Sequence, residues 1–112
     1  MMQRLEEWGA AILTQSGNVY TGVCIDTACS MGFCAEHAAA AAMITAGESR
    51  VLKMVAVGSK GRVLPPCGRC REFIGQLNDD NFKAEIMVGE GKIVALKELL
   101  PYDWRDSLTK EE

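Results

Sequence analysis

Three cysteines and one glutamate stand at spacings that can hold a metal ion beside a proton carrier. "CAE" places Cys34 two residues before Glu36, and "CGRC" places Cys67 three residues before Cys70. Cysteines three apart at the start of a helix can bind one ion together, with Cys34 as a third ligand. Three protein ligands leave the fourth tetrahedral position of a zinc ion open, as in catalytic sites. Glu36 can stand beside that position and carry protons without binding the metal.

The same residues also allow less specific interpretations. A Cys-x-x-Cys pair taken alone can be a redox pair or part of a structural zinc site. The one histidine, His37, could close the site as a fourth ligand. Ligation by His37 would require Cys34 and His37 to share one helical turn while Glu36 points elsewhere. We therefore favour a position for His37 outside the ligand set. Cys24 and Cys29 are interpreted as small buried residues.

Loops that run into helices must position these side chains. The alanine-rich segment 34–47 predicts one helix, because alanine is the best helix former. Segment 67–77 predicts a second helix, because its apolar residues fall on one helical face. Both cysteine stretches therefore begin helices, where unpaired N–H groups and the helix dipole stabilise thiolates.

Strands are predicted around the two helices. The pattern gives a hairpin from residues 8–13 and 19–25 and further strands at 52–58, 84–89 and 92–96. A short helix over 97–104 should be stopped by Pro101, and the tail from residue 105 should fray. The order β-β-α-β-α-β-β-α predicts an α/β fold with a mixed five-stranded sheet. Helices on both faces would make it a three-layer α/β/α sandwich.

Composition narrows the class of protein. The chain of 112 residues fits one domain, residues 1–112, with 15 acidic and 12 basic residues and a net charge of −3. That charge argues against nucleic acid as a partner. The longest apolar run, 38–44, is too short to span a membrane, and we see no signal peptide at the start. We therefore expect a cytoplasmic location, where cysteines are thiols or metal ligands rather than disulfides.

The motifs "CAE", "PCGRCRE" and "ELLP" together resemble those of the cytidine deaminase family, and they are similar to those of the related blasticidin-S deaminases. The similarity runs from "WGAAIL" to "LLPYDW", nearly the whole chain, and the family has the three-layer fold. The resemblance implies that Cys34, Cys67 and Cys70 hold one Zn²⁺ per subunit. It also implies that Glu36 moves a proton from water to ring N3 of cytosine and then helps ammonia leave from C4.

The resemblance also implies a set of substrate contacts. Ala35 matches a substrate-contacting position, and Trp104 falls where the family places an aromatic residue against the base, with the alternative that Trp104 packs in the core or at an interface. The family's Gly-x-Asn-x-Glu run, which binds the ribose hydroxyls, is "GVCID" here. Cys24 therefore replaces the Asn, and Asp26 replaces the Glu with a shorter carboxylate. Asp26 either contacts the substrate or, as the alternative, caps a turn. A thiol is a poor hydrogen-bond partner, so we expect altered sugar recognition.

The charge of the metal site predicts a need for nearby donors. Three thiolates and Zn²⁺ carry a net charge of −1, which makes a poor Lewis acid unless donors temper the thiolates. Helix N–H groups, Arg69, Arg71 and His37 are the candidates. Family members often have an Arg directly after "CAE", where this chain has His37. We therefore expect Arg69 or Arg71 to carry more of this task.

Together, these features predict zinc-dependent deamination of a free cytosine nucleoside, with cytidine and deoxycytidine as the first candidates. The resemblance implies a homo-oligomer, a tetramer or a dimer, whose active sites borrow residues across interfaces. An antibiotic deaminase of the blasticidin-S type is the alternative within the class, favoured by "CGRCRE" and the altered ribose run. A catalytically silent zinc module is the alternative from another class, favoured because only about seven residues precede the first strand, so the family's first helix has no counterpart. The acidic charge and the Cys as first ligand disfavour a nucleic-acid editor.

Overall fold

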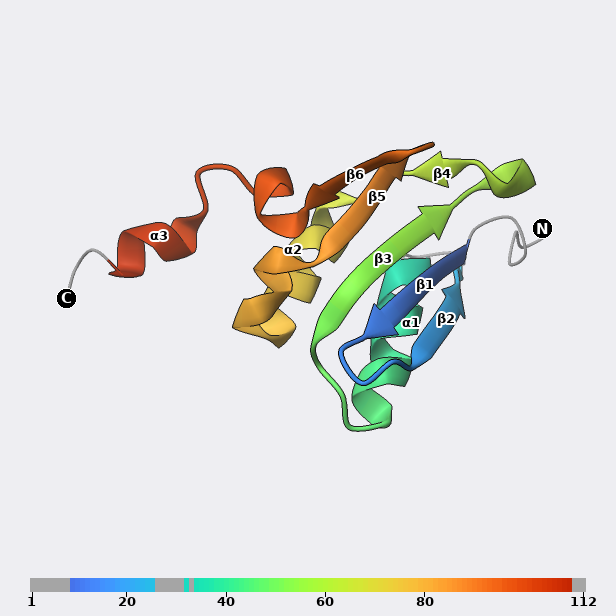
Figure 1. Ribbon diagram of the computed structural model, residues 1–112, viewed down its shortest axis with the longest axis horizontal. Coiled ribbons are helices and arrows are strands. Elements are labelled where there is room, and N and C mark those ends of the chain that lie inside the picture. The colour runs from blue at the N-terminus through green and yellow to red at the C-terminus, as the bar shows by residue number, and fades with distance from the viewer. Residues whose placement is uncertain (1–8, 26–31, 33, 110–112) are drawn as a thin grey trace.

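A mixed β-sheet forms the centre of the computed structural model, which describes residues 9–25, 32 and 34–109 (Figure 1). The main path of the sheet has the order β2–β1–β3–β5–β6, and β4 pairs with β3. The strands are β1 (Gly9–Thr14), β2 (Val19–Val23), β3 (Val51–Val57), β4 (Val63–Leu64), β5 (Glu85–Gly89) and β6 (Lys92–Ala95).

The strand directions confirm the predicted mixed α/β fold. β1 is antiparallel to both β2 and β3, β5 is antiparallel to β6, and β3 and β5 run parallel. The helices are α1 (Ala35–Thr45), α2 (Gly68–Leu77) and α3 (Trp104–Thr109), with short 3-10 helices η2 (Ser59–Gly61), η3 (Asp79–Lys83) and η4 (Leu96–Leu99).

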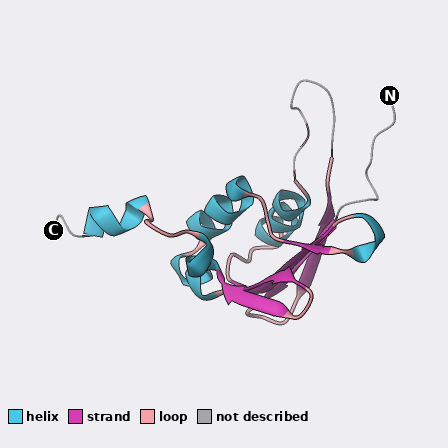
Figure 2. Ribbon diagram, turned by 90° about the horizontal axis from the view of Figure 1, so that it is seen from above, coloured by secondary structure: helices cyan, strands magenta, loops and turns pink. Residues whose placement is uncertain are grey.

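Helices α1 and α2 lie on the same side of the sheet (Figure 2). The buried residues Ala10 and Ile12 of β1 face that side and join the main core cluster. On the opposite face Val19 and Ile93 are 62% and 52% exposed. Within the described residues, the sheet is therefore covered by α1 and α2 from one side, and α3 extends away beyond η4 (Figure 1).

Close packing between α1 and β2 depends on Gly22. A Cβ atom at Gly22 would lie 2.5 Å from the backbone nitrogen of Ala39 and 2.7 Å from the carbonyl oxygen of Ala35. The alanine run supplies the other half of this approach, since Ala39 and Ala40 are fully buried. The sequence thus brings the first turn of α1, which carries the candidate site residues, directly against the sheet.

The end of the chain differs from the prediction of one helix over 97–104. The first helical segment is η4, which ends at Leu99 before Pro101, because proline removes a backbone donor and clashes with the preceding turn. A separate helix, α3, then forms in the tail that was expected to fray. Its Arg105 contacts Glu72 of α2 at 3.0 Å and Asp103 at 2.9 Å, which ties α3 to the body.

None of the helices in the described part of the chain has the length and apolar character needed to cross a membrane.

Candidate metal centre and active site

The N-terminal ends of α1 and α2 bring three thiols together. Cys34 is the N-cap residue of α1 and Cys67 is the N-cap residue of α2. The sulfur of Cys67 lies 3.5 Å from that of Cys34 and 3.1 Å from that of Cys70. The sulfurs of Cys34 and Cys70 lie within 4.8 Å of each other. Two stretches that are distant in sequence therefore form one cluster.

The size of this triangle suits a single metal ion. Zinc–sulfur bonds of about 2.3 Å at tetrahedral angles place two ligand sulfurs about 3.8 Å apart. The sulfur separations of 3.1 and 3.5 Å are a few tenths of an ångström shorter than that value, so small side-chain adjustments would seat one ion. Two other potential ligand atoms lie close by. A ring nitrogen of His37 lies within 4.8 Å of the sulfurs of Cys34 and Cys70, and a carboxylate oxygen of Glu36 lies within 4.8 Å of the sulfurs of Cys67 and Cys70.

The protonation of the thiols is strongly coupled to burial. Burial raises the pKa of Cys34 and raises that of Cys70 far more, and the neighbouring thiols and Glu36 add to the effect for Cys70. Burial also raises the pKa of Cys67, but hydrogen bonds with Cys70 and Cys34 outweigh it, so its pKa lies below that of a free thiol. A divalent cation that replaces these protons would supply the charge that the buried thiolates need.

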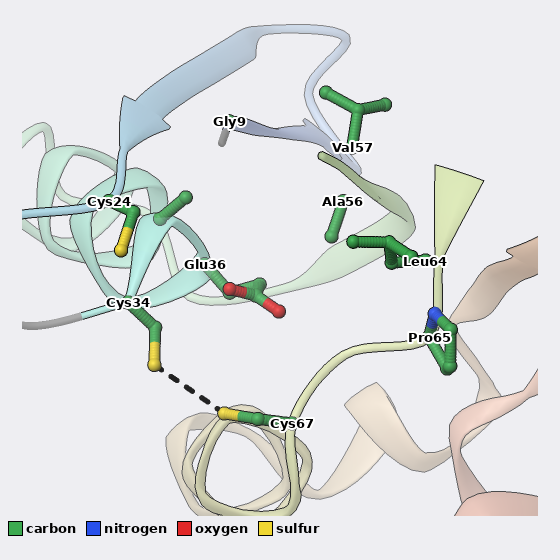
Figure 3. A pocket seen from close by; sticks show the side chains of 10 residues that line it. Gly9, Cys24, Cys34, Glu36, Ala56, Val57, Leu64, Pro65 and Cys67 are labelled. Atoms are coloured by element: carbon green, nitrogen blue, oxygen red, sulfur yellow. Dashed lines mark hydrogen bonds between the residues drawn. The ribbon is translucent and has the colours of Figure 1, made fainter. Parts of the chain in front are cut away.

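Glu36 is held at the base of a cavity beside the thiols. It lies on the buried face of α1, and the residue is 8% exposed. Figure 3 shows its carboxylate pointing into the cavity between the thiol pair and the side chains of Leu64 and Pro65. A buried carboxylate next to a candidate metal site is placed to accept a proton from one group and donate it to another.

The cavity has a volume of about 500 Å³, within the range of small-molecule sites. Apart from the thiols and Glu36, its described lining is apolar (Figure 3). Cys24 and Ala35, both predicted to contact substrate, line this cavity. The other lining residues are Gly9, Cys34, Glu36, Ala56, Val57, Leu64, Pro65 and Cys67.

Two features that sequence reasoning missed set the position of Cys67. The short strand β4 pairs Leu64 with Ala56 of β3, which leads the chain toward the cavity. The guanidinium of Arg71 then donates to the carbonyl oxygens of Pro66 at 2.8 Å and Leu99 at 3.5 Å. The adjacent prolines before Cys67 were the available signal for such a fixed approach, because each has a restricted backbone angle.

His37 is the candidate donor that the structure places nearest to a thiol. Its Nδ1 atom lies 3.2 Å from the sulfur of Cys70, and its ring stacks on Phe73 of α2 with centroids 4.2 Å apart. Burial lowers the pKa of His37, and the positive charge of Arg69 lowers it further. Arg69 itself is exposed, and Arg71 is used by backbone carbonyls.

The remaining predicted contacts lie elsewhere or outside the described residues. Trp104 is 56% exposed on α3, and its indole nitrogen donates to Glu72 at 3.4 Å, so within one chain it is not part of the described cavity lining. Asp26 and Cys29 lie outside the described residues. The substrate roles proposed for Trp104 and Asp26 stay predictions.

Comparison with known proteins finds relatives that are named cytidine deaminases, although no protein-family model matches the chain. A cytidine deaminase of Halalkalibacterium halodurans is 33% identical over 97 residues, covering 83% of this chain and 73% of the relative. A cytidine deaminase of Mycobacterium tuberculosis is 39% identical over 67 residues, or 59% of this chain, and this match spans only 50% of the relative's length.

Solved structures are similar in fold as well as in sequence. The crystal structure of cytidine deaminase from Mycobacterium tuberculosis superposes with a TM-score of 0.78 at 32% identity, covering 87% of this chain and 77% of that one. The crystal structure of the cytidine deaminase from Bacillus anthracis gives a TM-score of 0.74 at 26% identity, covering 94% of this chain and 81% of that one.

Proposed function

Because this chain belongs to the cytidine deaminase family, we propose that it is a zinc-dependent aminohydrolase that removes the amino group from C4 of a free cytosine nucleoside. The observation that carries the proposal is the convergence of Cys34, Cys67 and Cys70 beside the buried Glu36, at the base of a cavity of suitable size. The products would be the uracil nucleoside and ammonia.

The donor chemistry of the cluster supports zinc bound by the three thiols. Thiolates are preferred zinc ligands, and three of them leave one coordination position for chemistry. A zinc ion bound there would supply the Lewis acid that makes water nucleophilic near neutral pH. We place Glu36 and His37 outside the ligand set, Glu36 because its carboxylate points into the cavity and His37 because its Nδ1 lies at hydrogen-bond distance, 3.2 Å, from the sulfur of Cys70.

The chain's own residues would divide the remaining work. Glu36 would take a proton from the nucleophilic water and deliver it to ring N3 while the water oxygen adds to C4. It would then carry the proton of the added hydroxyl to the amino group, which leaves as ammonia when the C4–N bond breaks. Ala35 and the apolar wall of Leu64 and Pro65 would hold the base and exclude bulk water. Cys24 at the edge of the same cavity would meet the sugar, or another substituent, with a weak hydrogen-bonding group.

Cys24 is also the observation that favours a second candidate substrate. A thiol in the cavity lining offers little to ribose hydroxyls, so a cytosine nucleoside with a modified sugar, as in blasticidin S, fits the same chemistry.

The reducing cytoplasm is the compartment that would keep the clustered thiols available for metal.

We also propose that the chain works as a homo-oligomer, a tetramer in the first instance. Support comes from exposed apolar side chains on α3 and in the segment just before it. Tyr102 is fully exposed, and Trp104 and Leu108 are 56% and 52% exposed. An assembly would bury these side chains and could carry Trp104 to the cavity of a neighbouring subunit. Light scattering on the zinc-loaded protein should give a mass above that of the 12.2 kDa chain; a monomer would remove this part of the proposal.

An ultraviolet assay of zinc-loaded protein tests the function directly. Cytidine, deoxycytidine, cytosine and blasticidin S would be followed side by side by loss of cytosine absorbance and release of ammonia, with Glu36→Gln as control. Turnover that disappears in the control supports the proposal, and the substrate turned over decides between the two candidates. Full occupancy by zinc without turnover of any of the four would contradict it and favour a silent zinc module.

A further inference from the structure

The sulfur of Cys70 is the most deeply buried of the three thiols. Cys70 is fully buried, whereas Cys34 is half-buried and Cys67 is exposed. Water can therefore solvate the other two sulfurs, but a thiolate at Cys70 must find its hydrogen-bond donors within the protein. A buried charge without such a donor carries a large desolvation cost.

Few side chains are close enough to meet this need. Among the described contacts, the sulfur of Cys70 lies 3.1 Å from the sulfur of Cys67 and 3.2 Å from Nδ1 of His37, and the sulfur of Cys34 is within 4.8 Å. Once a metal ion has converted Cys67 and Cys34 to thiolates, those sulfurs no longer have hydrogens to donate. Of these three neighbours, only the imidazole N–H of His37 then remains as a donor to Cys70.

The ring of His37 is held in the orientation that such a bond requires. It comes from the first turn of α1 and stacks on Phe73 at an interplanar angle of 12°. Phe73 lies three residues after Cys70, so it is on the same face of α2, one turn away. The stacking fixes the plane of the imidazole, which keeps Nδ1 directed at the neighbouring sulfur.

We propose that His37 is a positioning residue whose Nδ1–H donates a hydrogen bond to the Cys70 thiolate and so tempers the electron-rich metal site. The inference rests on the proposed function only in assuming that the three cysteines bind one metal ion. It gives His37 the task that the sequence assigned chiefly to Arg69 or Arg71. A hydrogen bond to a ligand sulfur withdraws electron density from the metal–sulfur bond, which leaves the metal a stronger Lewis acid.

Nuclear magnetic resonance can observe this bond directly, because His37 is the one histidine of the chain. The protein would be labelled with ¹⁵N-histidine and loaded with ¹¹³Cd²⁺. We expect Nδ1 to carry a proton that shows scalar coupling to cadmium through the sulfur. An Nδ1 without a proton, or a direct cadmium–nitrogen coupling that makes His37 a ligand, would overturn the proposal. Neither result depends on whether the enzyme turns over any nucleoside.

Two variants separate donation from packing. His37→Asn places an amide N–H close to the position of Nδ1 but removes the ring, whereas His37→Phe keeps a ring against Phe73 and removes the donor. In Co²⁺-loaded protein we expect the sulfur-to-cobalt charge-transfer band to move to longer wavelength in His37→Phe and to stay near the wild-type position in His37→Asn. On an active substrate, His37→Phe should lose roughly 10- to 100-fold in kcat and His37→Asn only a few-fold.

The opposite ranking would overturn the proposal, because a role in packing alone predicts that the ring-preserving variant behaves like the wild type. Equal band positions in the wild type and both variants would do the same. A His37→Phe chain that fails to bind Co²⁺ would point to a ligand role and also contradict the proposal. Failure of the proposed function would look different: normal bands in the wild type with no deamination.

Discussion

The two ends of the α1–α2 pair treat buried polar groups in different ways. At the N-terminal ends, Cys34, Cys67 and Cys70 contact mainly one another, and an added cation would complete their interactions. At the C-terminal ends the polar groups are satisfied by the protein itself. The central residue there is Asn81, which follows α2 and is fully buried.

Asn81 shows how complete the satisfaction is at this second end. Its side-chain oxygen accepts from the backbone nitrogen of Val51 at 2.7 Å, and its amide donates to the carbonyl oxygens of Ser49 at 2.9 Å and Ile74 at 3.0 Å. One side chain therefore joins the start of β3 to the end of α2. The N-terminal ends form a chemical end, whose thiols are placed to bind a cation. The C-terminal ends form a scaffold end, whose hydrogen bonds hold α2 and β3 together. Changes at the two ends should therefore fail in different measurements.

The largest effect is expected from Glu36→Gln, which removes the proton carrier but keeps the shape of the side chain. The rate of deamination should fall by about 10²- to 10⁴-fold, the usual contribution of acid–base catalysis. Zinc content and melting temperature should remain those of the wild type, because the proposed ligands are untouched. Kinetics and metal analysis on the same preparation check this, with Glu85→Gln, an exposed glutamate on β5, as the matched control. A fall no larger than that of the control would remove Glu36 from the proposed chemistry.

A packing change at Gly22 tests whether the chemical end depends on close contact between α1 and the sheet. Gly22→Ala would place a Cβ 2.5 Å from the backbone of α1, so the helix must move. We expect about 1–3 kcal/mol of destabilisation from overpacking and a fall in kcat, because the first turn that carries Glu36 would shift.

Gly89→Ala provides the control for Gly22, because a Cβ there meets no atom within 4 Å. Urea unfolding and kinetics would be measured for both variants. Wild-type stability in Gly22→Ala would show that the helix is less tightly placed than the distances indicate.

Sequence reasoning succeeded where the pattern was local. The strands β1 to β3 and both main helices follow from apolar runs and alanine content, and the cysteine spacing indicated that Cys34, Cys67 and Cys70 lie together. The two-residue strand β4 and the helix α3 were missed, because each depends on a distant partner, β3 for one and Glu72 for the other.

Asn81 was missed for the same reason. Two of its hydrogen-bond partners, Ser49 and Val51, lie about 30 residues away, so nothing in its own neighbourhood marks it. Motifs reveal groups that share a chemical task, whereas a buried polar network becomes visible only when the fold brings its members together.

Asn81→Ala should break the scaffold end and leave the chemistry intact. It would leave the buried N–H of Val51 without its partner, which costs about 1–3 kcal/mol, and would free two carbonyl oxygens as well. The midpoint of urea unfolding should fall, while kcat per bound zinc stays near the wild-type value. Asn81→Asp, which keeps the acceptor for Val51 but loses both donors, should be less stable than the wild type. A loss of kcat without a loss of stability would show that the two ends are not separable.

The smallest effect concerns Glu48, which follows α1 at the same scaffold end. Its carboxylate accepts hydrogen bonds from the hydroxyl of Tyr20 at 2.6 Å and the amide of Asn18 at 2.8 Å. The hydrogen bond from Tyr20 first, then those from Thr14 and Asn18, lower the pKa of Glu48 to about 2, against about 4.3 in an unfolded chain. Because the folded pKa is depressed, the stabilisation is present above about pH 4.3 and is lost as the pH falls toward 2.

The test compares the wild type with Glu48→Gln in urea unfolding at several pH values between 6 and 2. The difference in midpoint should be largest near pH 6 and shrink as the pH falls through this window. Taking the difference between two chains with the same metal site cancels the separate effect of acid on the thiols. Tyr20→Phe removes the leading hydrogen bond, so its Glu48 should titrate closer to the ordinary value and lose its contribution at higher pH. If the difference in urea midpoint between the wild type and Glu48→Gln stays constant over the whole pH range, the charge on Glu48 does not stabilise this end.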